Sequence, residues 1–136
     1  MLREERAVDT WFEGLSLPVS DLDRSVAWYE ALGFVCEVRT HQFGLMRLGA
    51  GTVGLLDLGV GVTRDADTGG GRLRSFVQVE MGTDDLDVLY ADLLARGVAV
   101  HTPPRDRGFE RSLQLRDPDG FTVEFAEGAR GRNRTD

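Results

Sequence analysis

The feature that most constrains this sequence is an internal repeat. Asp21-Leu22-Asp23 recurs 64 positions later as Asp85-Leu86-Asp87, and further identities fall at the same offset. These identities are Ala27 with Ala91, Ala31 with Ala95, and Gly33 with Gly97. Both stretches have apolar residues at helical spacing and end in a glycine, the residue that most readily terminates a helix in the left-handed conformation. The repeat therefore indicates a duplicated unit, and the fold must accommodate both copies.

Each predicted helix lies in the same sequence context. Ser20 or Asp21 is positioned to cap the first helix, and Thr83 or Asp84 the second. An alternating strand precedes each helix, with Leu15, Leu17 and Val19 in one copy and Val77, Val79 and Met81 in the other. Strand-like segments follow at 34–39, 43–48 and 52–58, and again at 98–102, 111–116 and 121–125. Each copy is therefore predicted to be a βαβββ module.

The predicted fold class is α+β, with the paired modules forming curved mixed sheets around a cavity. We expect one domain over residues 10–127, built from modules at 10–60 and 74–127. The intervening segment 61–73 is rich in glycine and is predicted to be a linker, and 1–9 and 128–136 to be flexible tails. A chain of 136 residues with 41% hydrophobic and 29% charged residues has ordinary globular composition.

Strand alternation predicts which side chains face the helices. Leu15, Leu17 and Val19 should pack under the first helix, which leaves Gly14 and Ser16 on the other face. In the second copy the face away from the helix receives Phe76, Gln78, Glu80, Thr122 and Glu124. A polar face of this kind suits a ligand cavity, although antiparallel sheets also commonly have one face in water.

Charge and residue types exclude several classes of partner. Sixteen basic residues against 23 acidic ones give a net charge of −7, and the only local basic cluster lies in the C-terminal tail. Nucleic acid is therefore not an expected partner, whereas a cationic small molecule would suit the acidic surface. One cysteine, Cys36, excludes an internal disulfide and a thiolate zinc cage. With no apolar segment long enough for a membrane span or a signal peptide, we expect a cytoplasmic protein.

Two motifs carry a family resemblance. The first runs from Gly14-Leu15-Ser16-Leu17-Pro18-Val19-Ser20-Asp21-Leu22-Asp23 to Leu32-Gly33-Phe34, and the second is Arg116-Asp117-Pro118-Asp119-Gly120-Phe121-Thr122-Val123-Glu124-Phe125. Together they resemble the vicinal oxygen chelate superfamily, which contains glyoxalases, bleomycin-resistance proteins and extradiol dioxygenases. The resemblance implies paired βαβββ modules around a cavity, often in a homodimer, which we predict here. It does not select among lyases, isomerases, transferases, dioxygenases and drug-binding proteins.

The resemblance also implies four metal-ligand positions. They fall on Gly14, Leu55, Phe76 and Glu124, of which only Glu124 can bind a metal. We therefore predict no metal and no other cofactor, with a divalent metal held by an unexpected set such as Glu124, Asp57 and His41 as the alternative. If the alignment is right, histidines introduced at positions 14 and 76 should create a zinc site with Glu124.

The predicted ligand-binding residues combine the open sheet faces with candidate stacking and charged groups. They are Ser16, Phe43, Arg47, Leu55, Asp57, Phe76, Gln78, Glu80, Phe109 and Glu124. Several alternatives remain open at this point. Arg47 could pair with Asp57 or Glu124 or lie on the surface, and Phe76 could form a cavity wall or merely fill space. Glu124 could bind a ligand or be satisfied by an arginine.

The sequence thus favours a metal-independent protein that binds a small aromatic or cationic molecule, with sequestration of an antibiotic or natural product as one role. One alternative is a metal-dependent lyase, isomerase or dioxygenase. Another is a metal-free enzyme that uses Glu124 and Glu80 as an acid–base pair. The sequence identifies neither the ligand nor whether catalysis occurs, and no catalytic residue is assigned.

Overall fold

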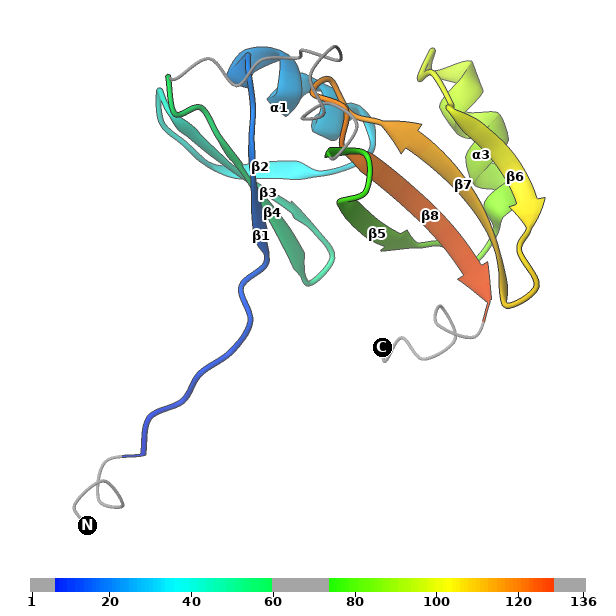
Figure 1. Cartoon of the computed structure of the whole chain (residues 1–136), viewed down its shortest axis with the longest axis horizontal. Helices are drawn as coiled ribbons and strands as arrows, with labels where there is room; N and C mark the ends of the chain where they lie inside the picture. Colours follow the sequence, from blue (N-terminus) through cyan, green and yellow to red (C-terminus); the bar gives the residue numbers. More distant parts are fainter. Residues whose placement is uncertain (1–6, 60–73, 129–136) are drawn as a thin grey trace.

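A computed structural model describes residues 7–59 and 74–128 of the chain. Module 1 (7–59) contains β1 (Leu15–Pro18), α1 (Leu22–Ala31), β2 (Val35–Arg39), β3 (Phe43–Leu48) and β4 (Gly51–Leu56). Module 2 (74–128) contains β5 (Gln78–Gly82), α3 (Leu86–Ala95), β6 (Thr102–Asp106), β7 (Glu110–Arg116) and β8 (Thr122–Gly128). Figure 1 shows both as βαβββ units, in agreement with the repeat. The predicted linker and most of the predicted tails lie outside the described residues.

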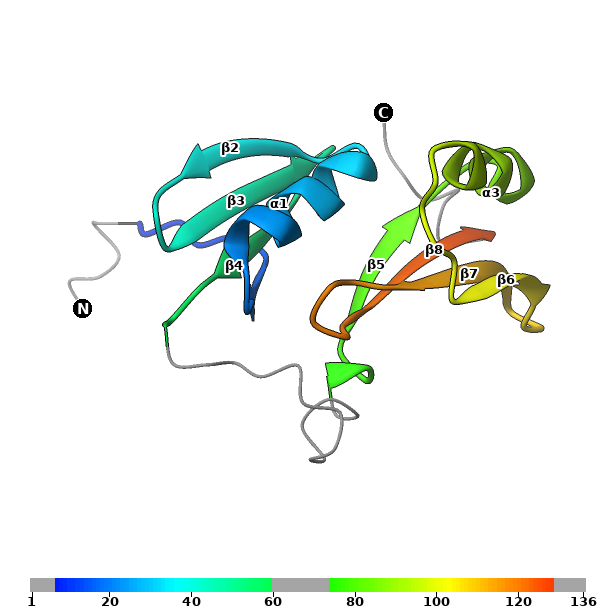
Figure 2. The ribbon, with the colours of Figure 1, turned by 90° about the horizontal axis from the view of Figure 1, so that it is seen from above.

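The two modules form separate four-stranded mixed sheets with the same topology. The strand order is β1-β4-β3-β2 in module 1 and β5-β8-β7-β6 in module 2. In each sheet the first strand pairs in parallel with the last, and the other neighbours are antiparallel. Each helix packs on one face of its own sheet (Figure 2). The predicted α+β class with paired mixed sheets is confirmed.

The helices begin and end at equivalent points of the repeat. The Asp21 carboxylate accepts a hydrogen bond from the Arg24 amide at 3.1 Å and caps α1. Asp85 caps α3 in the same way, through the Val88 amide at 3.0 Å. The prediction of Thr83 or Asp84 as the second cap is therefore wrong, because the capping aspartate is the first residue of the repeated tripeptide. Gly33 and Gly97 follow the helices with φ of +108° and +78°, as predicted.

One face of each sheet forms the hydrophobic core under its helix. Leu17 and Val19 are buried as predicted, but Leu15 is 50% exposed. The prediction that Leu15 packs under α1 is wrong because β1 is an edge strand and α1 contacts mainly β2, β3 and β4. The faces turned away from the helices carry the polar alternation. We call the face of the second sheet opposite α3 the open face of module 2.

The first strand after the helix of module 2 was predicted in the wrong place. Instead of 98–102, the strand β6 covers Thr102–Asp106 and includes Pro103 and Pro104. Prolines lack the N–H needed inside a sheet, so the sequence favours a break there. They are accommodated because β6 is the outermost strand, and its register with β7 shifts between Thr102 and Arg105.

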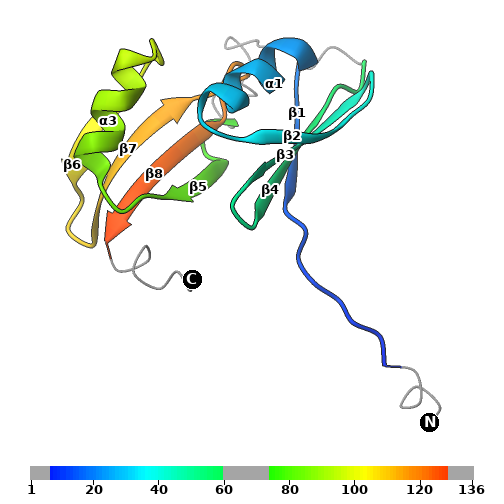
Figure 3. The ribbon, with the colours of Figure 1, turned by 180° about the vertical axis from the view of Figure 1, so that it is seen from behind.

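A buried polar contact joins the two modules where α1 meets the β7–β8 turn (Figure 3). The Tyr29 hydroxyl donates to Asp117 Oδ2 at 2.8 Å, and both residues are buried. Asp117 also accepts the Asp119 and Phe121 amides at 2.9 Å, while the Asp119 carboxylate accepts the Ser20 amide at 3.2 Å. Burial raises the pKa of the Asp117 carboxyl above its ordinary value, and burial beside Asp117 raises the pKa of Tyr29. These hydrogen bonds hold α1 of module 1 against the β7–β8 turn of module 2.

Candidate ligand-binding pocket between the modules

A pocket of about 720 Å³ lies where β1 and β4 of module 1 approach β5 of module 2. A volume of this size is typical of a site for a small molecule. Its apolar lining is formed by Phe12, Leu15, Phe34, Leu48, Val53, Val79 and Met81. Its polar side chains are Thr52, Gln78, Glu80, Thr83 and Glu124.

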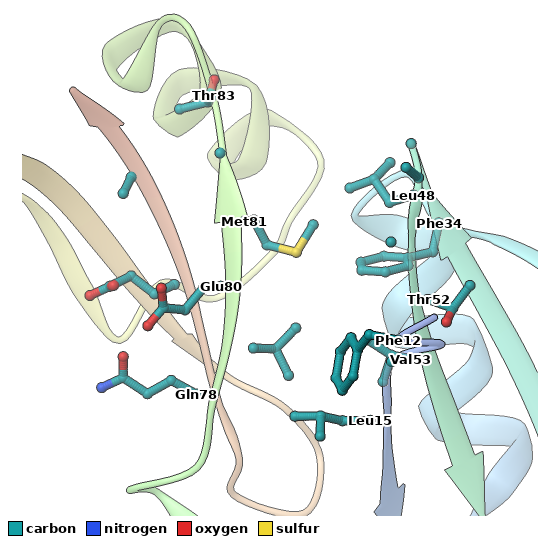
Figure 4. A pocket seen from close by; sticks show the side chains of 18 residues that line it. Phe12, Leu15, Phe34, Leu48, Thr52, Val53, Gln78, Glu80, Met81 and Thr83 are labelled. Atoms are coloured by element: carbon teal, nitrogen blue, oxygen red, sulfur yellow. The ribbon is translucent and has the colours of Figure 1, made fainter. Parts of the chain in front are cut away.

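The polar and apolar parts of this lining lie on two sides of β5. Figure 4 shows Met81 directed toward Phe34 and Leu48 of module 1, whereas Gln78 and Glu80 leave the strand on the other side. Alternation along an edge strand produces this division, because consecutive side chains point to opposite faces. The pocket therefore offers an apolar cleft between the modules that continues around β5 onto the open face of module 2.

Glu124 is the most constrained acidic group of the pocket. Its side chain is only 4% exposed, and Oε2 accepts Arg107 Nη1 at 2.8 Å and Gln114 Nε2 at 3.1 Å. The Arg107 guanidinium in turn lies 5.5 Å from the centre of the Phe109 ring. A buried carboxylate in a protein is normally paired and hydrogen-bonded in this way. Of the alternatives open for Glu124, the structure selects pairing with an arginine.

Removing Arg107 should therefore destabilise the protein. In Arg107→Gln, Glu124 remains buried without its cation, and we expect the free energy of unfolding to fall by about 2 kcal/mol. Glu124→Gln in the same chain removes the uncompensated charge and should restore part of that loss. Urea unfolding of the parent, both single variants and the double variant measures the coupling. Additive effects of the two substitutions would show that the pair contributes no coupling energy.

Glu80 lies directly beside Glu124, since the two are partners in the parallel pairing of β5 with β8. Side chains in this position lie on the same face of the sheet. Glu80 is exposed, whereas Glu124 is buried. The two carboxylates therefore differ in burial: Glu124 is buried and bound by Arg107, whereas the Glu80 side chain is exposed.

Three of the predicted ligand-binding residues line the pocket, namely Gln78, Glu80 and Glu124. Ser16 and Phe43 lie on the corresponding face of module 1, where both approach Gly54. Neither belongs to the pocket lining. They remain predicted ligand-binding residues.

The other predicted residues lie apart from the pocket. Arg47 pairs with Glu37 at 2.8 Å, so of the two alternatives left open it is a surface arginine and does not pair with Asp57 or Glu124. Leu55 is fully buried in the core on the helix side of β4. Asp57 accepts the Gly59 amide just after β4, at 2.9 Å. Phe76 precedes β5 and Phe109 lies in the β6–β7 turn, each 69% exposed.

The apolar half of the pocket is what sequence reasoning missed. Phe34, Leu48 and Val53 occur in segments that were correctly predicted as strands or strand ends, but nothing local marks them as pocket residues. They become a pocket wall only because module 2 approaches them. Phe12 lies in the N-terminal extended segment, and its aromatic ring is the one signal that could have suggested a binding role.

Comparison with known proteins agrees with this architecture. The family model of the Glyoxalase/Bleomycin resistance protein/Dioxygenase superfamily matches residues 11–125. No protein of curated function matches the sequence. Among solved structures, a bleomycin-binding protein complexed with bleomycin superposes with a TM-score of 0.67 at 22% identity, covering 88% of this chain and 100% of the other.

Two further structures have different printed functions. TnmS3, an antibiotic-binding protein from a Streptomyces species, gives a TM-score of 0.68 at 22% identity and covers 90% of this chain and 100% of its own. A lactoylglutathione lyase from Agrobacterium tumefaciens gives 0.67 at 20% identity, covering 88% of this chain and 95% of its own. The fold and the family model together define the class: the chain belongs to the Glyoxalase/Bleomycin resistance protein/Dioxygenase superfamily. In its described part, no helix has the length and apolar character of a membrane span.

The residues at the family's metal positions do not fit a metal ion. Gly14 has φ of +142°, and a Cβ there would lie 2.3 Å from the Thr52 carbonyl oxygen. Leu55 is in the core, Phe76 is exposed before β5, and Glu124 is held by Arg107. Within residues 7–59 and 74–128, no three His, Cys, Asp or Glu side chains are grouped to hold a metal. The donor set therefore offers a divalent ion no more than one carboxylate, which is already occupied by a cation.

Proposed function

We propose that this protein binds a small aromatic or cationic molecule without a metal ion, in the manner of the drug-binding branch of its superfamily. The observation that carries the proposal is the pocket itself, which joins an apolar cleft to a strip of carboxylate and amide groups around β5. The proposed role is sequestration of an antibiotic or natural product in the cytoplasm. The bleomycin-binding and antibiotic-binding proteins of the same fold support this role.

The apolar cleft supports an aromatic ligand. Phe12 and Leu15 are largely exposed, at 81% and 50%, so their surfaces are available to a ligand on the module 1 side. Phe34, Val53 and Met81 continue this surface toward module 2. Removing such surface from water stabilises a complex by roughly 25 cal/mol per Å², and aromatic rings gain further from stacking.

The carboxylates of the pocket lining support a cationic group on the ligand. Glu80 is exposed at the pocket edge, and Arg107 already neutralises the neighbouring Glu124. Because Glu80 is the exposed carboxylate of the pocket lining, it is the acidic group that a ligand cation can reach. The use of Glu80 and Glu124 as an acid–base couple is not favoured, because the Glu124 carboxylate is buried and already bound by Arg107 and Gln114.

Substitution of Leu15 tests the site. Leu15→Ser should weaken binding of bleomycin or of benzyltrimethylammonium about tenfold, because it removes apolar surface from the pocket without opening the core. The matched control is Val35→Ser, which makes a similar change at a 63% exposed position on β2. Isothermal titration of the parent and both variants provides the measurement, and EDTA should leave every affinity unchanged. If neither probe binds the parent, or if the parent needs a divalent metal to bind, the proposal fails.

We further propose that the protein is a homodimer. Residues 7–14 extend away from the sheets (Figures 1 and 3) and carry Val8, Trp11 and Phe12, which are each more than 70% exposed. An apolar segment of this kind, next to the free edge of β1, is suited to pair with a second copy. Light scattering is expected to give twice the chain mass at micromolar concentration. Val8→Ser with Trp11→Ser should shift the equilibrium toward monomer, whereas a monomeric parent would refute the proposal.

A further inference from the structure

Arg116 occupies a defined place on the open face of module 2. Its neighbours Leu113 and Leu115 in β7 are fully buried under α3, so alternation places Gln114 and Arg116 on the opposite face. The hydrogen bond from Gln114 to Glu124 confirms that Gln114 and Glu124 lie on the same face of the sheet. Across the sheet, Arg116 pairs with Thr122 and Thr122 pairs with Gln78. Arg116 therefore lies two strands, roughly 10 Å, from a residue that lines the pocket.

The fold supplies this guanidinium with no counter-ion. Nη1 of Arg116 is buried and has no hydrogen-bond partner, and no ion pair among the described residues includes Arg116. Glu124 lies two residues along β8 from Thr122, the residue paired with Arg116. Its carboxylate already accepts hydrogen bonds from Arg107 and Gln114. The residues that follow Arg116 directly across the sheet, Thr122 and Gln78, carry no charge.

An arginine in this condition is unusual. A guanidinium has only donors and no acceptor, and a buried N–H group without an acceptor costs free energy. Nearly all such groups in folded proteins have a partner from the protein, from water or from a ligand. The planar arrangement of its donors matches a carboxylate in particular.

We infer that Arg116 is an anion-binding residue and that the molecule bound by this protein carries a carboxylate in addition to its aromatic or cationic part. This inference rests on the proposed small-molecule function and adds the charge pattern of the ligand. Arg116 and Glu80 then sit at different points of one face, with Gln78 between the pocket and Arg116. Such a face favours a ligand that bears both charges over a simple cation.

Titration with benzoate tests the inference. Binding is measured by calorimetry and by the chemical shifts of the ¹⁵N resonances of the arginine side chains. Benzoate should shift the Nε–Hε resonance of Arg116, and Arg116→Gln should weaken benzoate binding at least tenfold. Benzyltrimethylammonium has a similar ring with the opposite charge, and its affinity should not fall in this variant. The matched control is Arg39→Gln, which removes an exposed arginine that pairs with Asp23 in module 1.

A second measurement separates binding from a structural role. The Arg116 side chain forms no bond that its removal would break, so Arg116→Gln and Arg116→Met should melt at the same temperature as the parent or higher, with the oligomeric state of the parent. Equal benzoate affinity in the parent and Arg116→Gln would overturn the inference, as would loss of the dimer with benzoate binding intact. If benzyltrimethylammonium binds and benzoate does not, the anion site is refuted while the proposed function survives. If neither of these two molecules binds, the anion site is refuted, and the proposed function is refuted as well when bleomycin also fails to bind.

Discussion

Replacing Asp117 with alanine is expected to lower the free energy of unfolding by about 3–5 kcal/mol, the range found when one partner of a buried polar group is removed. Asp117 is 4% exposed and accepts the Tyr29 hydroxyl and the Asp119 and Phe121 amides. Alanine leaves all three donors buried without an acceptor. The substitution also breaks the contact between the modules, so the loss should extend to the geometry of the pocket.

Urea unfolding measures this loss, with Asp84→Ala as the matched control because Asp84 is exposed in the same module. The control should change the stability by no more than about 0.5 kcal/mol. Tyr29→Phe removes one of the three hydrogen bonds and should cost about 1–2 kcal/mol. A change below 1 kcal/mol for Asp117→Ala would mean that water replaces the carboxylate and that the junction is not a determinant of stability.

The same carboxylate makes the stability depend on pH. Burial raises the pKa of Asp117 above its ordinary value of 3.8, so ionisation is less favourable in the folded state than in the unfolded state. Its favourable contribution is complete below pH 3.8 and is lost as the pH rises through the folded pKa. Relative to Asp117→Asn, which does not titrate, the parent should therefore lose stability as the pH rises above 3.8. A difference that is constant with pH would contradict the raised pKa.

Gly14→Ala is expected to cost about 3 kcal/mol or more. At φ of +142°, an added Cβ would lie 2.3 Å from the Thr52 carbonyl oxygen and 2.5 Å from its Oγ1, so the backbones of β1 and β4 would have to separate. Gly49→Ala is the matched control, because Gly49 also has a positive φ, +61°, but no atom within 4 Å of its Cβ position. It should cost only about 1 kcal/mol, the strain of the conformation alone. Thermal unfolding of the two variants separates crowding from strain, and equal losses would refute the crowding.

This result bears on the predicted zinc site. The expectation that histidines at positions 14 and 76 would bind zinc with Glu124 conflicts with the structure on three counts. Gly14 cannot accept a side chain without displacement, Phe76 lies outside β5, and Arg107 holds Glu124. We expect the double variant to be destabilised and to bind zinc no better than the parent. Calorimetric titration with zinc on the folded fraction checks this.

The sequence predicted what depends on local pattern. The repeat, the helix spacing and the glycines after the helices identified two βαβββ modules, because each of these features is determined within a few residues. Residues in edge strands were predicted less well. β6 accommodates prolines because it is an edge strand, and Leu15 is exposed because β1 is an edge strand. Both errors come from neighbours that are distant in sequence.

The candidate site was predicted only on the module 2 side. Alternation along β5 and β8 identified Gln78, Glu80 and Glu124, which line the pocket. The apolar wall depends on how the modules meet, and their contacts join residues far apart in the sequence, such as Tyr29 and Asp117, 88 residues apart. Likewise, the sequence allowed pairing of Glu124 with an arginine only as an alternative. Arg107 lies in the β6–β7 turn and contacts Glu124 only in the folded structure.

The junction between the modules gives the two halves of the repeat different roles. Tyr29 comes from α1, and the residue at the same offset in α3 is Leu93, which has no hydroxyl. The acceptors come from the β7–β8 turn, and the equivalent β3–β4 turn, Gly49-Ala50, has no side chain that accepts a hydrogen bond. Two copies of either half would therefore lack one side of the contact. A duplication that began with interchangeable halves has produced a donor half and an acceptor half, each dependent on the other for this contact.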